Sequence, residues 1–150
     1  MMPTTNASLD FRGYACFDRV GGKWYARRTD HSSGRPRTIR LHRFILGPCA
    51  APQIDHKNGD GLDNRRTNIR PCTVSQNRAN IDRAKNNKAG FKGVHLHKRT
   101  GKWRAVIRLN KRSIHLGLFH DRAEAARAYN AAAAQYFGEF ARLNIIPGGH

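Results

Sequence analysis

A repeated two-residue alternation in the second half of the chain constrains the fold more than any other feature of the sequence. Apolar residues stand at every second position in residues 103–110, and again in residues 113–118, with mostly polar residues between them. Residues 94–97 alternate in the same way. Because successive side chains of a strand point to opposite faces, this pattern predicts three strands with one apolar and one polar face.

A helix is predicted to follow these strands and to cover their apolar face. Asp121 and Glu124 supply the polar residues of a helix start, and Gly138 stands where the helix should end. Between them, apolar residues recur at helical spacing: Ala125, Tyr129, Ala132, Ala133, Tyr136 and Phe137. The many alanines would let the helix lie close to the sheet. We therefore expect a three-stranded antiparallel sheet packed against one C-terminal helix.

The preceding region is predicted to have the order strand, loop, strand, helix. Residues 53–57 indicate a short strand, residues 58–61 a turn, and residues 68–70 the start of a second extended piece. Thr73 and Gln76 have the spacing of a capping box, so a helix should begin there. Short strands, rich in aromatic and β-branched residues, are expected before this region, and residues 41–46 are expected to turn helical.

Together these patterns predict an α+β chain made of two small domains. The first spans residues 1–81, with its core in residues 41–81. A polar, asparagine-rich linker follows in residues 82–89. The second domain spans residues 90–144, and a tail covers residues 145–150.

Strong positive charge indicates an anionic partner. The chain has 28 Lys and Arg against 10 Asp and Glu, a formal net charge of +18. Residues 83–120 contain eleven Lys or Arg and no Asp or Glu, and the alternation puts Arg104 and Arg108 on the sheet face that the helix leaves open. This favours a phosphate-binding surface. A solvated basic surface, or a structural RNA-binding protein, would also explain the charge.

Several classes of protein are not favoured. No run of about 18 apolar residues exists, so no membrane span is predicted. The first residues lack the basic start and apolar stretch of a signal peptide. Cys16, Cys49 and Cys72 are odd in number and widely spaced, which indicates a reduced, intracellular protein.

One short region combines residues with the chemistry of a metal site and a base. A carboxylate such as Asp55 suits Mg²⁺ or Mn²⁺, and the imidazole of His56 can accept a proton near neutral pH. Asn77 could complete the metal site with its amide oxygen. Taken alone, the Asp-His pair reads as structural. Asp60 and Asp63 are expected to serve turn geometry.

A longer string in this region resembles the HNH endonucleases, most closely the phage and group I intron homing type. The matching residues are Asp55-His56-Lys57-Asn58-Gly59-Asp60, Leu62-Asp63-Asn64-Arg65, Asn68-Ile69-Arg70, Asn77 and Asn80, and Leu41-His42-Arg43 upstream. The resemblance spans roughly residues 41–81 and implies a small ββα-metal nuclease core. Asn80 itself is expected to be a solvent-facing helix residue.

The resemblance to HNH enzymes also implies roles. His56 would be the general base, Asn68 would hold the loop that orients it, and Asp55 with Asn77 would bind one divalent ion, Mg²⁺ or Mn²⁺. The implied activity is a metal-dependent endonuclease that hydrolyses phosphodiester bonds of double-stranded DNA, by nicking or double-strand cleavage. A phage-encoded or mobile-element enzyme of this kind would act in the cytoplasm of a bacterial host. The sequence does not determine the oligomeric state, and we favour a monomer.

The C-terminal half resembles the plant Apetala-type/ethylene-response-factor DNA-binding domain. The motifs are Phe91-Lys92-Gly93-Val94, Lys102-Trp103-Arg104-Ala105, His115-Leu116-Gly117-Leu118-Phe119, Ala125-Ala126-Arg127-Ala128-Tyr129-Asn130 and the final Gly138-Glu139-Phe140-Ala141-Arg142-Leu143-Asn144. The resemblance implies that the sheet enters the DNA major groove. By position, the residues facing DNA would be Lys92, His95, His97, Arg99, Arg104 and Arg108. An alternative to the nuclease is a catalytically inactive DNA-binding regulator that uses this sheet.

Overall fold

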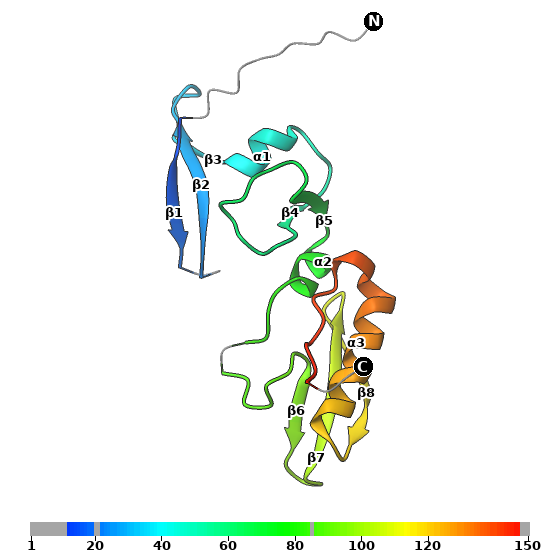
Figure 1. Ribbon diagram of the computed structural model, residues 1–150. Helices are drawn as coiled ribbons and strands as arrows, with labels where there is room; N and C mark the ends of the chain where they lie inside the picture. Colours follow the sequence, from blue (N-terminus) through cyan, green and yellow to red (C-terminus); the bar gives the residue numbers. More distant parts are fainter. Residues whose placement is uncertain (1–11, 20–21, 85, 148–150) are drawn as a thin grey trace, which may run out of the picture. The chain divides into compact units, whose positions relative to one another are not determined.

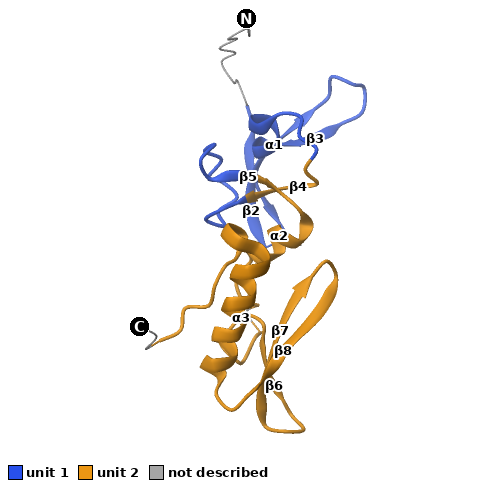
Figure 2. Ribbon diagram, turned by 90° about the vertical axis from the view of Figure 1, so that its right-hand side faces the viewer, with its two compact units in different colours: residues 1–50, 56–70 blue, residues 51–55, 71–150 orange. Residues whose placement is uncertain are grey.

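A computed structural model describes residues 12–19, 22–84 and 86–147. The chain forms two compact units, coloured separately in Figure 2. Unit 1 comprises residues 1–50 and 56–70, and unit 2 comprises residues 51–55 and 71–150. The separate folding of residues 1–81 and 90–144 stays a prediction. None of the helices in the described part of the chain has the length and apolar character that a membrane span requires.

Unit 1 begins with a three-stranded antiparallel sheet in the order β1-β2-β3. Strand β1 covers Tyr14–Asp18, β2 covers Lys23–Asp30 and β3 covers Arg37–Arg40. Helix α1, Leu41–Leu46, follows β3 directly and ends at a glycine with a φ of 69°. The expected early strands and the helical turn at residues 41–46 are therefore present.

The predicted order of strand, loop, strand and helix is also present. Strands β4, Gln53–His56, and β5, Ile69–Cys72, form a two-stranded sheet. Helix α2, Val74–Ala79, opens with the predicted capping box. The Thr73 hydroxyl accepts from the Gln76 backbone N–H at 3.2 Å, and the Gln76 side chain accepts from the Thr73 backbone N–H at 2.8 Å. This element order alone does not show the predicted ββα-metal nuclease core.

The rest of unit 2 is the predicted sheet and helix (Figure 1). Strands β6, Val94–His97, β7, Lys102–Leu109, and β8, Arg112–Phe119, form an antiparallel sheet in chain order. Helix α3, Arg122–Phe137, lies along one face and leads into a 3₁₀ turn, η1, at Gly138–Phe140. Asp121 caps α3 by accepting from two backbone N–H groups, at 2.9 and 3.2 Å. The α+β fold class is confirmed.

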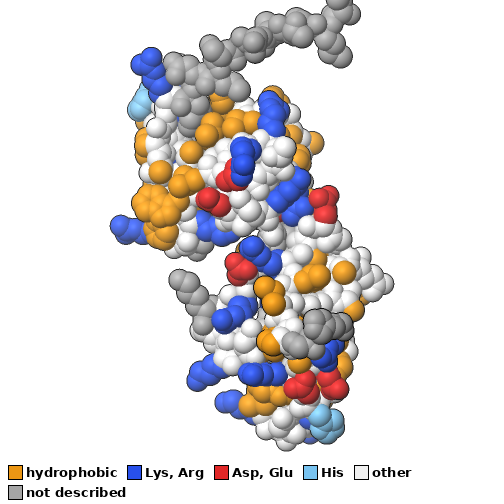
Figure 3. Space-filling view, in the orientation of Figure 1, with side chains coloured by type: hydrophobic (Ala, Val, Ile, Leu, Met, Phe, Trp, Pro, Cys, Tyr) orange, Lys and Arg blue, Asp and Glu red, His pale blue; other side chains and the backbone are white. Residues whose placement is uncertain are grey.

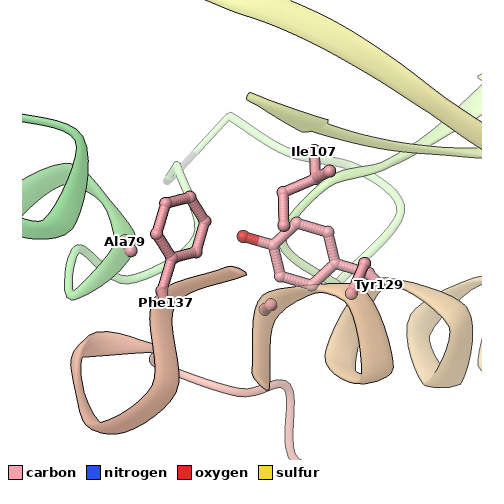
Figure 4. Close-up of a cluster of buried hydrophobic side chains, with 6 residues drawn as sticks. Ala79, Ile107, Tyr129 and Phe137 are labelled. Carbon is pink, nitrogen blue, oxygen red and sulfur yellow. The ribbon is translucent and has the colours of Figure 1, made fainter. Parts of the chain in front are cut away.

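Small residues let α3 approach the sheet closely. Ala125 and Ala126 of α3 are fully buried against Val94 and Ala105. A second cluster of buried side chains surrounds the other end of α3, and Figure 4 shows its larger members. This cluster contains Ala79, Ile107, Tyr129, Ala132, Ala133 and Phe137. Because Ala79 belongs to α2, this short helix packs into the same core as the sheet and α3.

A β-bulge changes the alternation in β8. Residues 114, 116 and 118 are predicted to share the apolar face, but Ala105 pairs with Gly117 while Val106 pairs with His115. One extra residue of β8, Leu116, therefore lies between two pairs, and it still packs against the core. Beyond the bulge the faces exchange, so Leu118 stands opposite Arg104 with 40% of its surface exposed. The prediction for Leu118 is wrong because the alternation counts residues on one strand only.

Asparagine side chains hold the segment after η1 in place. The Asn144 side chain accepts from the Lys92 backbone N–H at 2.6 Å and donates to the Lys92 carbonyl at 3.1 Å. The Asn130 side chain binds the backbone of Asn144 in the same reciprocal way, at 2.8 and 2.9 Å. The backbone of Lys92 is thus linked to helix α3 by hydrogen bonds through Asn144.

Candidate functional site

Basic side chains gather on the face of the β6–β8 sheet that α3 leaves open. Arg104 pairs across the strands with His95, and Arg108 pairs with Ser113. All four of these residues are exposed, whereas Ala105 and Ile107, which point the other way, are buried. The predicted placement of Arg104 and Arg108 therefore agrees with the structure. On the face in view in Figure 3, Lys and Arg are spread more widely than Asp and Glu.

One end of this open face is formed by the β6–β7 turn. His97 is half-buried and its Nδ1 lies 2.8 Å from the Thr100 hydroxyl. Arg99, in the same turn, is exposed, and Lys102 pairs with His97 across the strands. The turn and the two strand ends beside it thus place Arg99, His97 and Lys102 at the edge of the face.

Lys92 does not join the other residues predicted to face DNA. Its ammonium donates to the carbonyl of Ala79, and its backbone is held by Asn144. Burial lowers the pKa of Lys92 to about 8. The side chain therefore points into unit 2 rather than onto the open face.

Two further residues lie on the open face: His115, which the alternation puts on the polar side of its strand, and Leu118, which was predicted for the apolar side. Exposed His115 stands opposite Val106, and Leu118 reaches this face through the bulge. The signal for Leu118 is Gly117, which interrupts the alternation and has a φ of 144°. A glycine inside a strand pattern often marks a bulge.

The second group of predicted site residues is packed inside unit 1. The rings of His42 and His56 lie 5.1 Å apart, and the Tyr25 ring lies 6.0 Å from each. Both histidines are buried, and His56 Nε2 is 3.2 Å from the side-chain oxygen of Asn64. Burial, with a smaller contribution from His56, lowers the pKa of His42 to about 4. These rings form the aromatic interior of the unit.

Asn68 holds the loop between β4 and β5. Its side-chain oxygen accepts from the Asn58 backbone N–H at 3.1 Å, and its amide donates to the Asp63 carbonyl at 2.7 Å. Asp60 and Asp63 serve turn geometry, as expected. Asp60 accepts from the Leu62 backbone N–H at 2.9 Å, and Asp63 binds Arg65 at 2.7 and 2.8 Å. The hydrogen-bonded Arg65 guanidinium lowers the pKa of Asp63 to about 2.

The two predicted metal ligands, both in unit 2, already bind other side chains. Asp55 is buried, and its oxygens accept from the Asn80 amide at 2.9 and 3.1 Å. Asn80, expected to face solvent, is therefore buried as well. The Asn77 amide donates to Gln53 at 2.6 Å. Among the described residues, no group of three or more His, Cys, Asp or Glu could hold a metal ion. The divalent ion stays a prediction from the resemblance.

Comparison with known proteins finds similarity to APETALA2-like protein 2 of rice, in Oryza sativa subsp. indica and in subsp. japonica. Each is 45% identical to this chain over 62 residues, which cover 40% of the chain. The matched stretch covers 14% of the relative's length. No family model matches the chain, and no solved structure matches it. The predicted Apetala-type resemblance is confirmed for a stretch of this size.

The prediction of a metal-dependent HNH endonuclease is wrong. The similarity found is to APETALA2-like proteins, which favours the alternative of a DNA-binding regulator over a phosphodiester hydrolase. The resemblance to HNH enzymes in residues 41–81 rested only on residue types and their spacing. In the structure the imidazole of His56 lies among aromatic rings and the Asp55 carboxylate is bonded to Asn80. The implied phage origin and bacterial host have no support from the comparisons.

Proposed function

We propose that this protein is a DNA-binding regulator that binds double-stranded DNA with the open face of the β6–β8 sheet. The observation that carries the proposal is the basic face itself. Arg104 and Arg108 are exposed there on the central strand, and residues 83–120 contain no Asp or Glu. Similarity to the APETALA2-like proteins supports the same reading.

The side chains of this face suit the major groove of DNA. That groove is about 12 Å wide and admits a β-ribbon. Arginines such as Arg104 and Arg108 bind phosphate oxygens through paired hydrogen bonds, and exposed Leu118 can contact a thymine methyl group. Arg99, in the β6–β7 turn, would bind phosphate. An A-form RNA duplex has a deep, narrow major groove that a sheet does not enter, so the proposal is specific to DNA.

The proposal is tested by the salt dependence of binding to a fluorescently labelled DNA duplex. Each phosphate contact that is lost should reduce the slope of log K against log [salt] by about 0.9. Arg104→Gln/Arg108→Gln should therefore bind more weakly, with a slope smaller by about 1.8. The matched control is Arg122→Gln/Arg127→Gln, which removes two exposed arginines from α3.

The control variant should bind like the natural protein. An equal loss of DNA affinity in the two variants would mean that total charge, and not the sheet face, determines binding. An unchanged slope in the sheet variant would refute the proposed face. Stronger binding to an RNA duplex of the same sequence would favour a structural RNA-binding protein instead.

A further inference from the structure

Unit 2 contains a cavity of about 600 Å³ beside helix α2. Its volume lies within the range of sites that bind small molecules. Its lining includes Arg78, Lys92, Arg108, Lys111, Tyr129 and Phe137. They come from α2, from the segment before β6, from the β7–β8 hairpin and from α3, so four separate segments of one unit converge on it.

The wall of the cavity is largely apolar and includes the ring and hydroxyl of Tyr129. Tyr129 and Phe137 contribute rings, and Val74, which is 44% exposed, adds an aliphatic side chain. Figure 4 shows the hydroxyl end of Tyr129 directed toward Phe137. Burial raises the pKa of Tyr129 to about 12, so the hydroxyl remains a donor at neutral pH.

The charged residues of the cavity are all cationic. Arg78, Lys92, Arg108 and Lys111 line it, and no Asp or Glu does. The Lys92 ammonium is desolvated and donates to one carbonyl, although an ammonium has three donors. The nearby carboxylate, Asp82, is bound to Arg142 at 3.1 Å. An anion in the cavity would therefore compensate charges that the protein itself leaves unbalanced.

We propose that this cavity binds a small organic anion with a flat apolar body, such as an aromatic carboxylate or sulfonate. The anionic group would lie among the lining cations and accept from the Tyr129 hydroxyl. The aromatic body of the ligand would displace water from Tyr129, Phe137 and Val74. A cationic ligand would be repelled by the lining residues, and a neutral one would leave the desolvated Lys92 ammonium without an anion.

The ligand would also influence DNA binding, an extension that rests on the proposed function. Arg108 lines the cavity and also lies on the basic sheet face. An anion bound beside its guanidinium would compete with phosphate for the same hydrogen-bond donors. Ligand binding should therefore weaken the affinity for duplex DNA.

The probe for the cavity is 1-anilinonaphthalene-8-sulfonate, whose fluorescence rises on transfer to an apolar site. N-phenyl-1-naphthylamine has the same apolar body without the sulfonate, and should bind the full chain at least about tenfold more weakly. Tyr129→Phe keeps the ring and removes the hydroxyl, and Lys111→Gln removes one lining charge. Each should weaken sulfonate binding about tenfold. Arg127→Gln, which does not line the cavity, should leave it unchanged.

Two results would overturn the anion site. One is equal affinity for the sulfonate and the neutral probe, and the other is unchanged sulfonate affinity in both cavity variants. Saturating sulfonate should also raise the dissociation constant for duplex DNA in the natural protein. If the protein does not bind duplex DNA at all, the proposed function fails, while the probe titration still decides the cavity.

Discussion

Replacing Gly93 by alanine should destabilise unit 2 through a defined steric overlap. Gly93 has a φ of 75°, and its carbonyl accepts from the Val106 backbone N–H at 2.8 Å, so its backbone is fixed to β7. A Cβ atom at this position would lie 2.1 and 2.3 Å from two ring carbons of Tyr129. It would also lie 2.7 Å from the Val106 carbonyl oxygen. Tyr129 is only 5% exposed and belongs to the buried cluster around Ile107 and Phe137, so moving its ring would disturb that packing.

The expected cost has two parts. A left-handed backbone conformation costs an alanine about 1–2 kcal/mol relative to glycine. Forcing an extra carbon into a packed core costs about 1–3 kcal/mol. The free energy of unfolding should therefore fall by about 2–5 kcal/mol, a large share of the ~5–15 kcal/mol that stabilises a typical domain.

Urea unfolding followed by tryptophan fluorescence measures this loss. Trp103 reports on unit 2, so the exposed Trp24 of unit 1 is first replaced by phenylalanine. Gly101→Ala is the matched control, because Gly101 has a φ of 67° but no atom within 4 Å of the added carbon. It should show only the backbone cost of about 1–2 kcal/mol. Equal losses at the two positions would refute the contact between Gly93 and Tyr129.

Two further predictions concern pH and the C-terminal segment. The folded pKa of His42, about 4, lies below the ordinary value of 6.5, so stability is complete above pH 6.5 and is lost as the pH falls toward 4. The slope contributed by this residue approaches about 1.4 kcal/mol per pH unit. Urea titrations at several pH values should show that this pH dependence of stability is lost in His42→Phe. A variant with the same pH dependence as the natural protein would contradict the role of His42. Asn144→Ala removes both partners of the Lys92 backbone and should cost about 1–3 kcal/mol by the same method. Asn144→Asp keeps the acceptor for the Lys92 backbone N–H and should lose less stability than Asn144→Ala. An Asn144→Ala variant as stable as the natural protein would show that these two hydrogen bonds do not stabilise unit 2.

The elements that depend on local chemistry could be predicted from the sequence. Alternation along the strands placed β6, β7 and the first part of β8, because side-chain direction follows from residue spacing alone. The ends of α2 and α3 followed from Thr73, Asp121 and Gly138, whose side chains or backbone freedom act within one helical turn. Arg104 and Arg108 were placed on the open face for the same reason.

The elements that depend on distant contacts could not be predicted. The exposure of Leu118 depends on the register between β7 and β8. The burial of Asn80 depends on Asp55, which lies 25 residues earlier in the chain. Lys92 fitted a motif by position, but its ammonium reaches the carbonyl of Ala79. The endonuclease prediction, which rested on residue types and spacing in residues 41–81, is contradicted by the similarity to APETALA2-like proteins.

A residue-by-residue map of the DNA contact tests the proposed function most directly. Backbone amide resonances of the ¹⁵N-labelled protein would be followed by NMR while an unlabelled DNA duplex is added. The largest changes should occur in β6–β8, around His95, Arg104 and Arg108, and in the β6–β7 turn at Arg99. The exposed side of α3, including Arg127, should change little. The largest changes on α3, with an unaffected sheet, would contradict the proposed DNA-binding face.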